Sequence, residues 1–405
     1  MTDAAASALS PVSSRFDFSG VHAAVRRHID AGLIAGASHA VLLGQDLVDI
    51  GLQGHAVIED GTALRSDHLF RVFSNTKLVT SIAVMQLWEQ GRLGLDDPVE
   101  RHLPALGARQ VLRPGATQLD DTEPAHRPFT VRHLLSHSAG LSYGLFDPGS
   151  LLFKAYGERE VRHPAQTLAQ MVDALAPLPL AYHPGEGWEY SVATDVLGRV
   201  VEVLSGQPFG DYLQQHVFTP LGLRDTGFVV APEQQHRLAG YYLGADLLQP
   251  LLPGLTRVDA TQPFPGAYLQ PMARQSGGGG LVSSLPDMVT LVRSLLPGGP
   301  ALLKPDTLAL LRQDQLPAHV QQSFPNIGVL HGRGYGLCGG VIRRSSPLDH
   351  PAAAGEFYWG GLAGTQWFVH PGLNLAGVLM LQRVMGFSHP VGSDFKRSVY
   401  QAVAG

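Results

Sequence analysis

The segment Phe73-Ser-Asn-Thr-Lys-Leu-Val-Thr-Ser-Ile-Ala-Val-Met-Gln-Leu-Trp-Glu-Gln-Gly91 decides how the chain folds around its chemistry. Residues 75–90 are apolar on most sides, which predicts a helix buried inside the protein, with Gly91 at its C-terminal end. Ser74 and Lys77 share one face at the start of this helix, so the amine can reach the hydroxyl. A desolvated lysine can take the proton of a serine hydroxyl and make it a nucleophile. The helix N-terminus also favours a developing oxyanion.

The chain contains two other serine motifs. Ser393-Asp-Phe-Lys396 has the same spacing, but it lies on the last predicted helix, at an end that we expect to fray. Gly140-Leu-Ser-Tyr-Gly144 fits the Gly-x-Ser-x-Gly nucleophile elbow, which needs a strand before it and a helix after it. Here a helical pattern precedes the motif and a loop follows. Both motifs are therefore weaker candidates than Ser74.

Composition restricts the possible functions of the 405-residue chain. Hydrophobic residues make up 44% and charged residues 16%, as in globular proteins. The net charge of −5 and the absence of basic runs argue against nucleic-acid or anionic-membrane partners. The single cysteine, Cys338, excludes an internal disulfide and a cysteine-based zinc site. Residues 1–7 show no secretory signal pattern and no long apolar stretch occurs, so we expect a cytoplasmic protein.

The order of the predicted elements indicates one sheet built from both ends of the chain. A helix over 18–32 is followed by two strands within 38–54 that turn at Gly44-Gln-Asp46. Helices are expected over 131–137, 165–175, 191–204, 285–296 and 394–404, and strands over 334–342, 357–370 and 373–382. We therefore predict a discontinuous sheet domain of residues 1–95 and 276–405, and a mostly helical domain of residues 96–275, with the active site between them.

Several motifs, in order along most of the chain, resemble the serine β-lactamase and penicillin-binding-protein superfamily. They are Phe73-Ser-Asn-Thr-Lys, Gly91-Arg-Leu-Gly-Leu-Asp-Asp-Pro, His133-Leu-Leu-Ser-His-Ser-Ala-Gly-Leu, Pro184-Gly-Glu-Gly-Trp-Glu-Tyr-Ser, Gly206-Gln-Pro-Phe, Pro220-Leu-Gly-Leu and Gly277-Gly-Gly-Gly-Leu-Val-Ser-Ser. Within the superfamily the chain is most similar to the family VIII carboxylesterases, relatives of class C β-lactamases. The resemblance implies an α/β (α+β) protein of the β-lactamase/DD-peptidase-like fold, with a central antiparallel sheet flanked by helices and a mostly helical insertion.

The resemblance also implies a set of catalytic residues. Tyr190 in Tyr190-Ser191-Val192 matches the tyrosine of the family's Tyr-x-Asn motif. As a phenolate held by the charge of Lys77, it would deprotonate Ser74 and later activate water. The chain departs from the family at Val192, which replaces the asparagine that contacts the substrate amide in penicillin-binding members.

The third family element is Trp359-Gly360-Gly361, where β-lactamases carry Lys-Thr-Gly. An indole cannot compensate a buried carboxylate, so a neutral ester should be preferred over an anionic β-lactam. Gly360 and Gly361 would let the substrate approach the strand backbone. The family pattern assigns the oxyanion hole to the backbone N–H groups of Ser74 and Leu362.

The remaining signals indicate no cofactor. His133 and His137 have helical spacing, but the segment lacks a glutamate and a third ligand, so we expect structural roles and no metal. Gly277-Gly-Gly-Gly280 lacks the strand and the Lys-Ser/Thr of a nucleotide loop, and is interpreted as a loop that lets backbones crowd near the site.

These observations predict a serine carboxylesterase that hydrolyses short-chain esters through an acyl-enzyme, with a small-molecule ester as its partner. A β-lactamase, a D-amino-acid peptidase or an acyltransferase of the same fold are alternatives, and a non-catalytic binding protein is a further one. The pattern says nothing about the physiological ester, the stereochemical preference or the oligomeric state.

Overall fold

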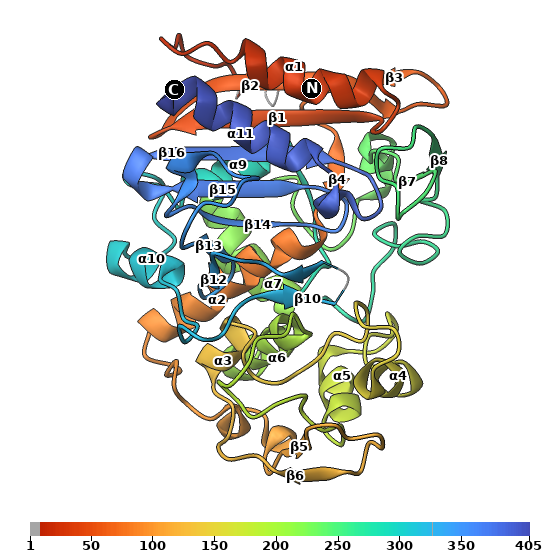
Figure 1. The fold of residues 1–405 in the computed structure, drawn as a ribbon, viewed down its shortest axis with the longest axis vertical. Helices are drawn as coiled ribbons and strands as arrows, with labels where there is room; N and C mark the ends of the chain where they lie inside the picture. The colour runs from red at the N-terminus through yellow and green to blue at the C-terminus, as the bar shows by residue number, and fades with distance from the viewer. Residues whose placement is uncertain (1–8, 326) are drawn as a thin grey trace.

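Eight antiparallel strands form one sheet in the order β12-β13-β14-β15-β16-β1-β2-β3 (Figure 1). The computed structural model describes residues 9–325 and 327–405. β1 pairs directly with β16, with Ala37 opposite Leu381, so both ends of the chain build the same sheet as predicted. The strands are β1 Gly36–Leu43, β2 Asp46–Val57, β3 Thr62–Ala63, β12 Arg333–Tyr335, β13 Gly340–Ile342, β14 Phe357–Gly360, β15 Gln366–His370 and β16 Leu375–Leu381.

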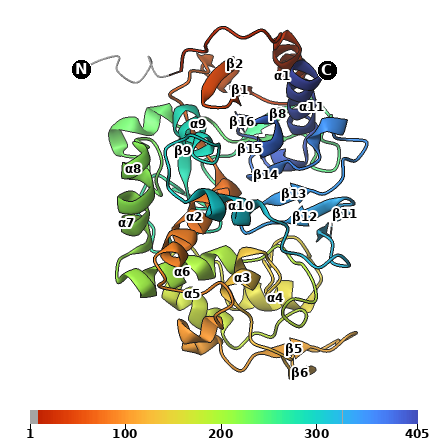
Figure 2. The ribbon, with the colours of Figure 1, turned by 90° about the vertical axis from the view of Figure 1, so that its left-hand side faces the viewer.

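Helices cover both faces of the sheet. On one face lie α1 (Ser19–Asp30) and α11 (Val391–Ala404), which contact each other, and on the opposite face lies α9 (Leu285–Arg293) (Figures 1 and 2). The hydrophobic core has one part on each face of the sheet, because successive side chains of a strand point to opposite faces. On β1, Val41 packs toward α1 and α11, whereas Leu42 faces the opposite side. Coverage of both faces explains why β1 is buried up to its last residue and β16 is buried along its whole length.

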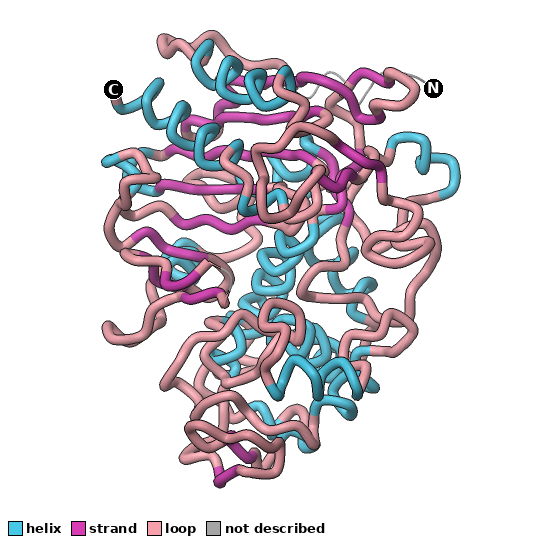
Figure 3. The backbone as a smooth tube through the Cα atoms, turned by 45° about the vertical axis from the view of Figure 1, so that its right-hand side comes forward, coloured by secondary structure: helices cyan, strands magenta, loops and turns pink. Residues whose placement is uncertain are grey.

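The helix α2 (Thr76–Glu89) links the sheet to the mostly helical half of the molecule (Figure 2). It is buried on nearly all sides, as its sequence predicts, and it packs against α6 (Ala193–Ser205). Figure 3 shows the helices of this half gathered below the strands of the sheet. The other helices are α3 Val131–Leu135, α4 Leu151–Glu158, α5 Leu168–Leu175, α7 Phe209–Leu213, α8 Thr219–Leu221 and α10 Pro305–Arg312.

Several short strand pairs lie outside the eight-stranded sheet. The pair β4–β9 lies directly before α2 and α9, and therefore positions the starts of both helices. The bounds are β4 Leu69–Arg71 with β9 Val282–Ser284, β5 Gln110–Leu112 with β6 Thr122–Pro124, β7 Tyr242–Gly244 with β8 Leu255–Arg257, and β10 Ser323–Phe324 with β11 Gly328–Val329.

Most predicted elements are confirmed, and the differences lie at turns and amphipathic segments. The predicted strand over 334–342 is a hairpin, because Gly336 and Gly339 close a turn in which the N–H of Gly336 donates to the carbonyl of Gly339 at 2.8 Å. The predicted strand over 357–370 is also a hairpin, of β14 and β15, because the chain turns between Gly361 and Thr365, where the N–H of Gly361 donates to the carbonyl of Thr365 at 2.7 Å. The helices α4, α7 and α10 were not predicted from the sequence. The two domain boundaries remain a prediction. Among the described residues, no helix has the length and apolar character needed to cross a membrane.

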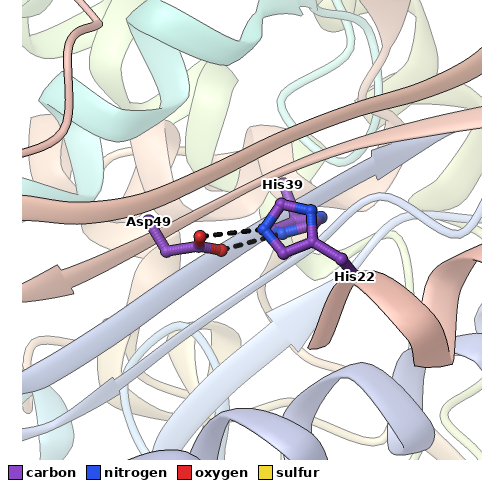
Figure 4. A group of neighbouring side chains, drawn as sticks. All are labelled: His22, His39 and Asp49. Atoms are coloured by element: carbon purple, nitrogen blue, oxygen red, sulfur yellow. Dashed lines mark hydrogen bonds and ion pairs between the residues drawn. The ribbon is translucent and has the colours of Figure 1, made fainter. Parts of the chain in front are cut away.

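A carboxylate held between two imidazoles ties α1 to the sheet (Figure 4). Asp49 on β2 lies 2.9 Å from His22 Nε2 on α1 and 3.0 Å from His39 Nε2 on β1. Burial alone would raise the pKa of Asp49, but the hydrogen bonds from both histidines outweigh it and lower the pKa to about 2. His39 is 0% exposed, and burial lowers its pKa, so it stays neutral next to the carboxylate.

Replacing Asp49 by alanine should lower the free energy of unfolding by about 1–3 kcal/mol at neutral pH, because His39 loses its buried partner. The pKa of Asp49 is depressed in the folded state, so its contribution is present above 3.8 and is lost as the pH falls toward about 2. Thermal unfolding of wild type and Asp49→Ala at several pH values measures this. Asp46→Ala, exposed on the same hairpin, is the control. An Asp49→Ala effect no larger than the control would contradict the assignment.

Candidate active site

Ser74 lies at a sharp bend between β4 and α2. It is half-buried within the single 3-10 turn Phe73–Asn75, which leads directly into α2. Phe73, the residue before it, has φ of 42°, a left-handed conformation that a bulky side chain rarely adopts. Such a conformation costs on the order of 1–3 kcal/mol and occurs preferentially at functional sites. The bend turns the serine toward the cavity described below.

Lys77 is 1% exposed and its amine points at Ser74. Nζ lies 3.4 Å from Ser74 Oγ and donates a hydrogen bond to the carbonyl of Gly278 at 2.7 Å. The amine also sits over the ring faces of Tyr190 and Tyr143, 4.5 and 5.4 Å from their centroids. Burial lowers the pKa of Lys77, with Tyr143 and Asp195 opposing this in part. A neutral amine, which can accept a proton, is therefore favoured more than in an exposed lysine.

Tyr190 comes directly before α6 and places its hydroxyl beside the serine. Its oxygen accepts a hydrogen bond from Trp359 Nε1 at 3.3 Å, and its ring packs against that of Trp359 at 5.4 Å between centroids. Burial raises the pKa of Tyr190, while hydrogen bonds with Ser74 and Trp359 act in the opposite direction. The net direction favours a protonated hydroxyl in the resting site, in place of the phenolate that the family resemblance implies.

The glycine run Gly277–Gly280 crosses the first turns of α2 at close range. A Cβ on Gly278 would lie 2.5 Å from Asp195 Oδ2 and 3.4 Å from Lys77 Nζ, and one on Gly277 would lie 2.6 Å from the carbonyl of Thr194. Thr80 Oγ1 donates to the carbonyl of Gly277 at 2.8 Å. The interpretation of this run as a loop that lets backbones crowd together is confirmed.

A cavity of about 670 Å³ brings most of the predicted residues together. Its walls include Ser74, Tyr190, Trp359, Gly360, Gly361 and Leu362. A Cβ on Gly361 would lie 2.3 Å from the carbonyl of Val72, so only glycine lets the end of β14 approach the Ser74 bend this closely. The N–H of Gly361 donates to Thr365 at 2.7 Å, and Leu362 is the next residue along the chain.

Tyr143 lies within the Gly140–Gly144 motif but was not predicted as a site residue. The Tyr143 ring stacks on Tyr190, with centroids 5.4 Å apart and planes 19° apart, and it lines the cavity. The Gly140–Gly144 segment therefore contributes an aromatic wall. Its Ser142 is buried, with its N–H donating to Tyr156 Oη at 3.0 Å, and the helix α3 precedes the segment where an elbow needs a strand.

The second Ser-x-x-Lys motif is held in an unrelated network. Lys396 forms an ion pair with Glu356, which is fully buried, and its amine lies 4.3 Å from the Tyr358 ring centroid. Ser393 donates to the carbonyl of Pro390 at 2.8 Å. The expectation that this helix end frays is wrong for Lys396, because the buried carboxylate and the aromatic ring fix it.

The histidines at 133 and 137 have the structural roles that were predicted. His133 closes a capping box with Thr130 at the start of α3, and burial lowers its pKa to about 4. His137 Nδ1 lies 3.0 Å from Ser191 Oγ and accepts the Ser191 N–H, which orients the segment that carries Tyr190. Among the described residues, two groups have a spacing compatible with a metal ion, and neither lines the cavity; they are His22, His39 and Asp49, and Glu123, His126 and His183.

A buried lysine, a serine at a strained bend and a tyrosine over the lysine define a class of serine-dependent acyl-transfer enzymes. Comparison with known proteins agrees. A family model described as Beta-lactamase matches residues 21–401. Protein Rv1367c of Mycobacterium tuberculosis is 35% identical over 372 residues, covering 90% of this chain and 89% of the relative. Esterase EstB of Burkholderia gladioli is 31% identical over 408 residues, covering 98% and 99%.

Among solved structures, EstCE1, described as a hydrolase with promiscuous acyltransferase activity, matches with a TM-score of 0.79 and 29% identity, covering 94% of this chain and 98% of that one. The chain belongs to the β-lactamase family. It is a serine hydrolase of the β-lactamase-like fold, and the likeness to EstB and EstCE1 supports the resemblance to family VIII carboxylesterases.

The contact between Gly278 and Lys77 can be tested with adjacent glycines. Gly278→Ala should lower kcat/KM on an aryl acetate by tenfold or more, because its methyl group would displace Asp195 or the lysine amine. Gly279→Ala is the matched control, since its Cβ would lie no closer than 3.7 Å to any atom. Both are measured with thermal unfolding alongside. Equal activity in the two variants would show that the crowding at Gly278 is not needed.

Proposed function

We propose that the chain is a carboxylesterase that hydrolyses short-chain esters through an acyl-enzyme on Ser74. The observation that carries this proposal is the contact of Lys77 Nζ with Ser74 Oγ at 3.4 Å, inside a site where burial lowers the pKa of the lysine. The amine is close enough to take the proton in the geometry of attack. Tyr190 lies against both groups and opens onto the same cavity.

In the acylation step, Ser74 Oγ attacks the ester carbonyl carbon as its proton passes to the Lys77/Tyr190 pair. The backbone N–H groups of Ser74 and Leu362 hold the oxyanion, and one such donor is worth roughly 3–4 kcal/mol of transition-state stabilisation. The bond to the alcohol oxygen then breaks, and the pair returns the proton to the leaving alkoxide through Tyr190. Serine, lysine and tyrosine regain their starting protonation except that Ser74 now carries the acyl group.

In the deacylation step, water takes the place of the alcohol. The pair removes one proton from the water as its oxygen attacks the acyl carbonyl, and the proton goes to Ser74 Oγ when that bond breaks. Trp359 supports both steps by donating to Tyr190, which fixes the direction of the phenolic O–H. Trp359, Gly360 and Gly361 would bind the ester along β14.

Two residues that differ from the β-lactamase motifs, Trp359 and Val192, argue against β-lactam hydrolysis at this site. Trp359 supplies an apolar ring where a β-lactamase needs a cation beside the antibiotic's carboxylate, and Val192 has no amide to contact the substrate. These departures favour esters whose scissile group carries no adjacent charge.

Acyl transfer to an alcohol is a second candidate, favoured by the likeness to EstCE1. The acyl-enzyme on Ser74 is common to both reactions, and the outcome depends on whether water or an alcohol reaches it. Hydrolysis of an aryl ester in the presence of increasing butanol, with butyl ester as the transfer product, measures the partition.

The nucleophile can be assigned with matched serine variants. Ser74→Ala should reduce kcat on 4-nitrophenyl butyrate by a factor on the order of 10³ or more, because no covalent intermediate can form. Ser142→Ala and Ser393→Ala, which alter the two other serine motifs, should keep activity within about threefold. Loss of activity in Ser142→Ala alone would restore the elbow and overturn the assignment.

The pH dependence should report on the lysine. Because burial lowers the pKa of Lys77 from its ordinary 10.5, kcat/KM should rise with pH as the amine loses its proton and level off at a pH below 10.5. Lys77→Arg should lose activity by a factor on the order of 10³, since a guanidinium stays protonated. An acidic limb centred at or above 10.5 would contradict a desolvated lysine base.

A further inference from the structure

Two arginines on the cavity wall have no acidic partner. Arg162 and Arg274 both line the cavity that contains Ser74. Their segments are adjacent, since the N–H of Arg274 donates to the carbonyl of Pro164 at 3.3 Å. In the part of the chain that the structure describes, neither guanidinium has a carboxylate within ion-pair distance.

The other charges of the cavity wall are already compensated or outside its interior. Arg333 is paired with Asp349 at 2.7 Å, and Lys396 is paired with Glu356. Arg397 is exposed and donates to the carbonyls of Pro347 and Leu348. In the described part of the chain, Arg333 Nη1 also lacks a hydrogen-bond partner, but the charge of Arg333 is compensated by Asp349. Arg162 and Arg274 are therefore the partly buried cations of this wall whose charge no described carboxylate compensates.

Each of the two arginines approaches an aromatic ring that borders the catalytic serine. The Arg162 guanidinium lies 5.2 Å from the Tyr143 ring centroid, and Tyr143 stacks on Tyr190. Arg274 is close enough to Tyr268 for its charge to oppose the burial that raises the pKa of that phenol. The Tyr268 ring packs at 6.3 Å against Phe73, the residue before Ser74. Arg162 is thus separated from Tyr190 by the Tyr143 ring, and Arg274 is separated from Ser74 by the rings of Tyr268 and Phe73.

The guanidinium groups of Arg162 and Arg274 have N–H donors that no acceptor among the described residues uses. Arg274 Nε is buried and has no hydrogen-bond partner, and Arg162 uses only Nη2, in a long 3.4 Å contact with the carbonyl of Gly144. A buried N–H without an acceptor destabilises the protein, more so when the group is charged, and an anionic ligand would remove that cost. A planar guanidinium matches a carboxylate especially well.

We propose that Arg162 and Arg274 form a carboxylate subsite of the catalytic cavity, and that the preferred ester carries a carboxylate several bonds from its scissile carbonyl. The proposal rests on the ester hydrolase function above and names its substrate class. It is compatible with the apolar Trp359, because the indole contacts Tyr190 directly from β14 whereas Arg162 reaches Tyr190 only through Tyr143. Trp359 disfavours a substrate carboxylate next to the scissile bond, whereas Arg162 and Arg274 would bind a carboxylate further from it.

The test compares charged and uncharged esters of equal size. On the acyl side, the pair is 4-nitrophenyl hydrogen adipate and the corresponding adipamate, in which an amide replaces the carboxylate. On the alcohol side, the pair is 4-acetoxybenzoate and 4-acetoxybenzamide. The measured quantity is the ratio of kcat/KM for the charged ester to kcat/KM for its amide, and the pair that shows the preference identifies the side of the ester that meets the arginines.

In the wild type we expect a ratio above one for at least one pair. Arg162→Met and Arg274→Met should each lower that ratio by about tenfold, as should the addition of about 0.5 M salt to a smaller extent. Arg159→Met is the matched control, because Arg159 is exposed and lies outside the cavity wall, and it should keep the wild-type ratio. Since the ratio is taken within one variant, partial misfolding cancels.

A ratio that stays at the wild-type value in both single variants and in the double variant would overturn the subsite. Binding of both ester pairs to Ser74→Ala, measured by calorimetry, gives a readout without turnover. Tighter binding of the charged ester that depends on the arginines supports the subsite even if Ser74 is not the nucleophile. Equal binding of the charged ester and its amide in both pairs rejects it even if the esterase activity is confirmed.

Discussion

The amine of Lys77 is buried at 1% exposure, and the architecture of the site follows from the need to satisfy it there. A lysine amine removed from water needs hydrogen-bond acceptors or aromatic faces, and it otherwise destabilises the fold. Gly278 supplies a carbonyl, Ser74 a hydroxyl, and Tyr190 and Tyr143 supply ring faces. The same burial that imposes these contacts lowers the pKa of the amine and so makes it useful as a base. The contacts that make burial of the Lys77 amine tolerable are therefore the same contacts that place it, with a lowered pKa, beside Ser74.

The groups around Lys77 come from parts of the chain that are far apart in sequence. The helix α2 carries the lysine, the run Gly277–Gly280 crosses it, and β14 ends at Trp359 and Gly360 beside it. Close approach depends on glycine at two of these crossings, since a Cβ on Gly278 or Gly361 would overlap neighbouring atoms. The cavity is therefore shaped by backbones that touch as much as by the side chains that line it.

The sequence predicted the parts of the structure that have a local cause. An apolar helix start that carries serine and lysine indicated both the buried α2 and the nucleophile, and the order of the predicted strands and helices indicated one sheet built from both ends of the chain. Tyr143 was missed because its role arises from stacking on Tyr190, 47 residues further along the chain, which no local pattern records. The prediction for Lys396 was wrong for the same reason, since its buried partner Glu356 lies 40 residues earlier in the chain, directly before β14. The protonation of Tyr190 likewise depends on burial that only the folded structure reveals.

The pairing of β1 with β16 has a consequence for how the protein is made. Ala37 pairs with Leu381, so the centre of the sheet cannot close until more than 340 residues between them have left the ribosome. Until then β1 and β2 expose apolar strand edges that could pair with another chain. Pairing over such a separation also makes loop closure costly and folding slow. Helices that pack locally in the middle of the chain, such as α5 with α6, can form before β16 is synthesised and completes the sheet.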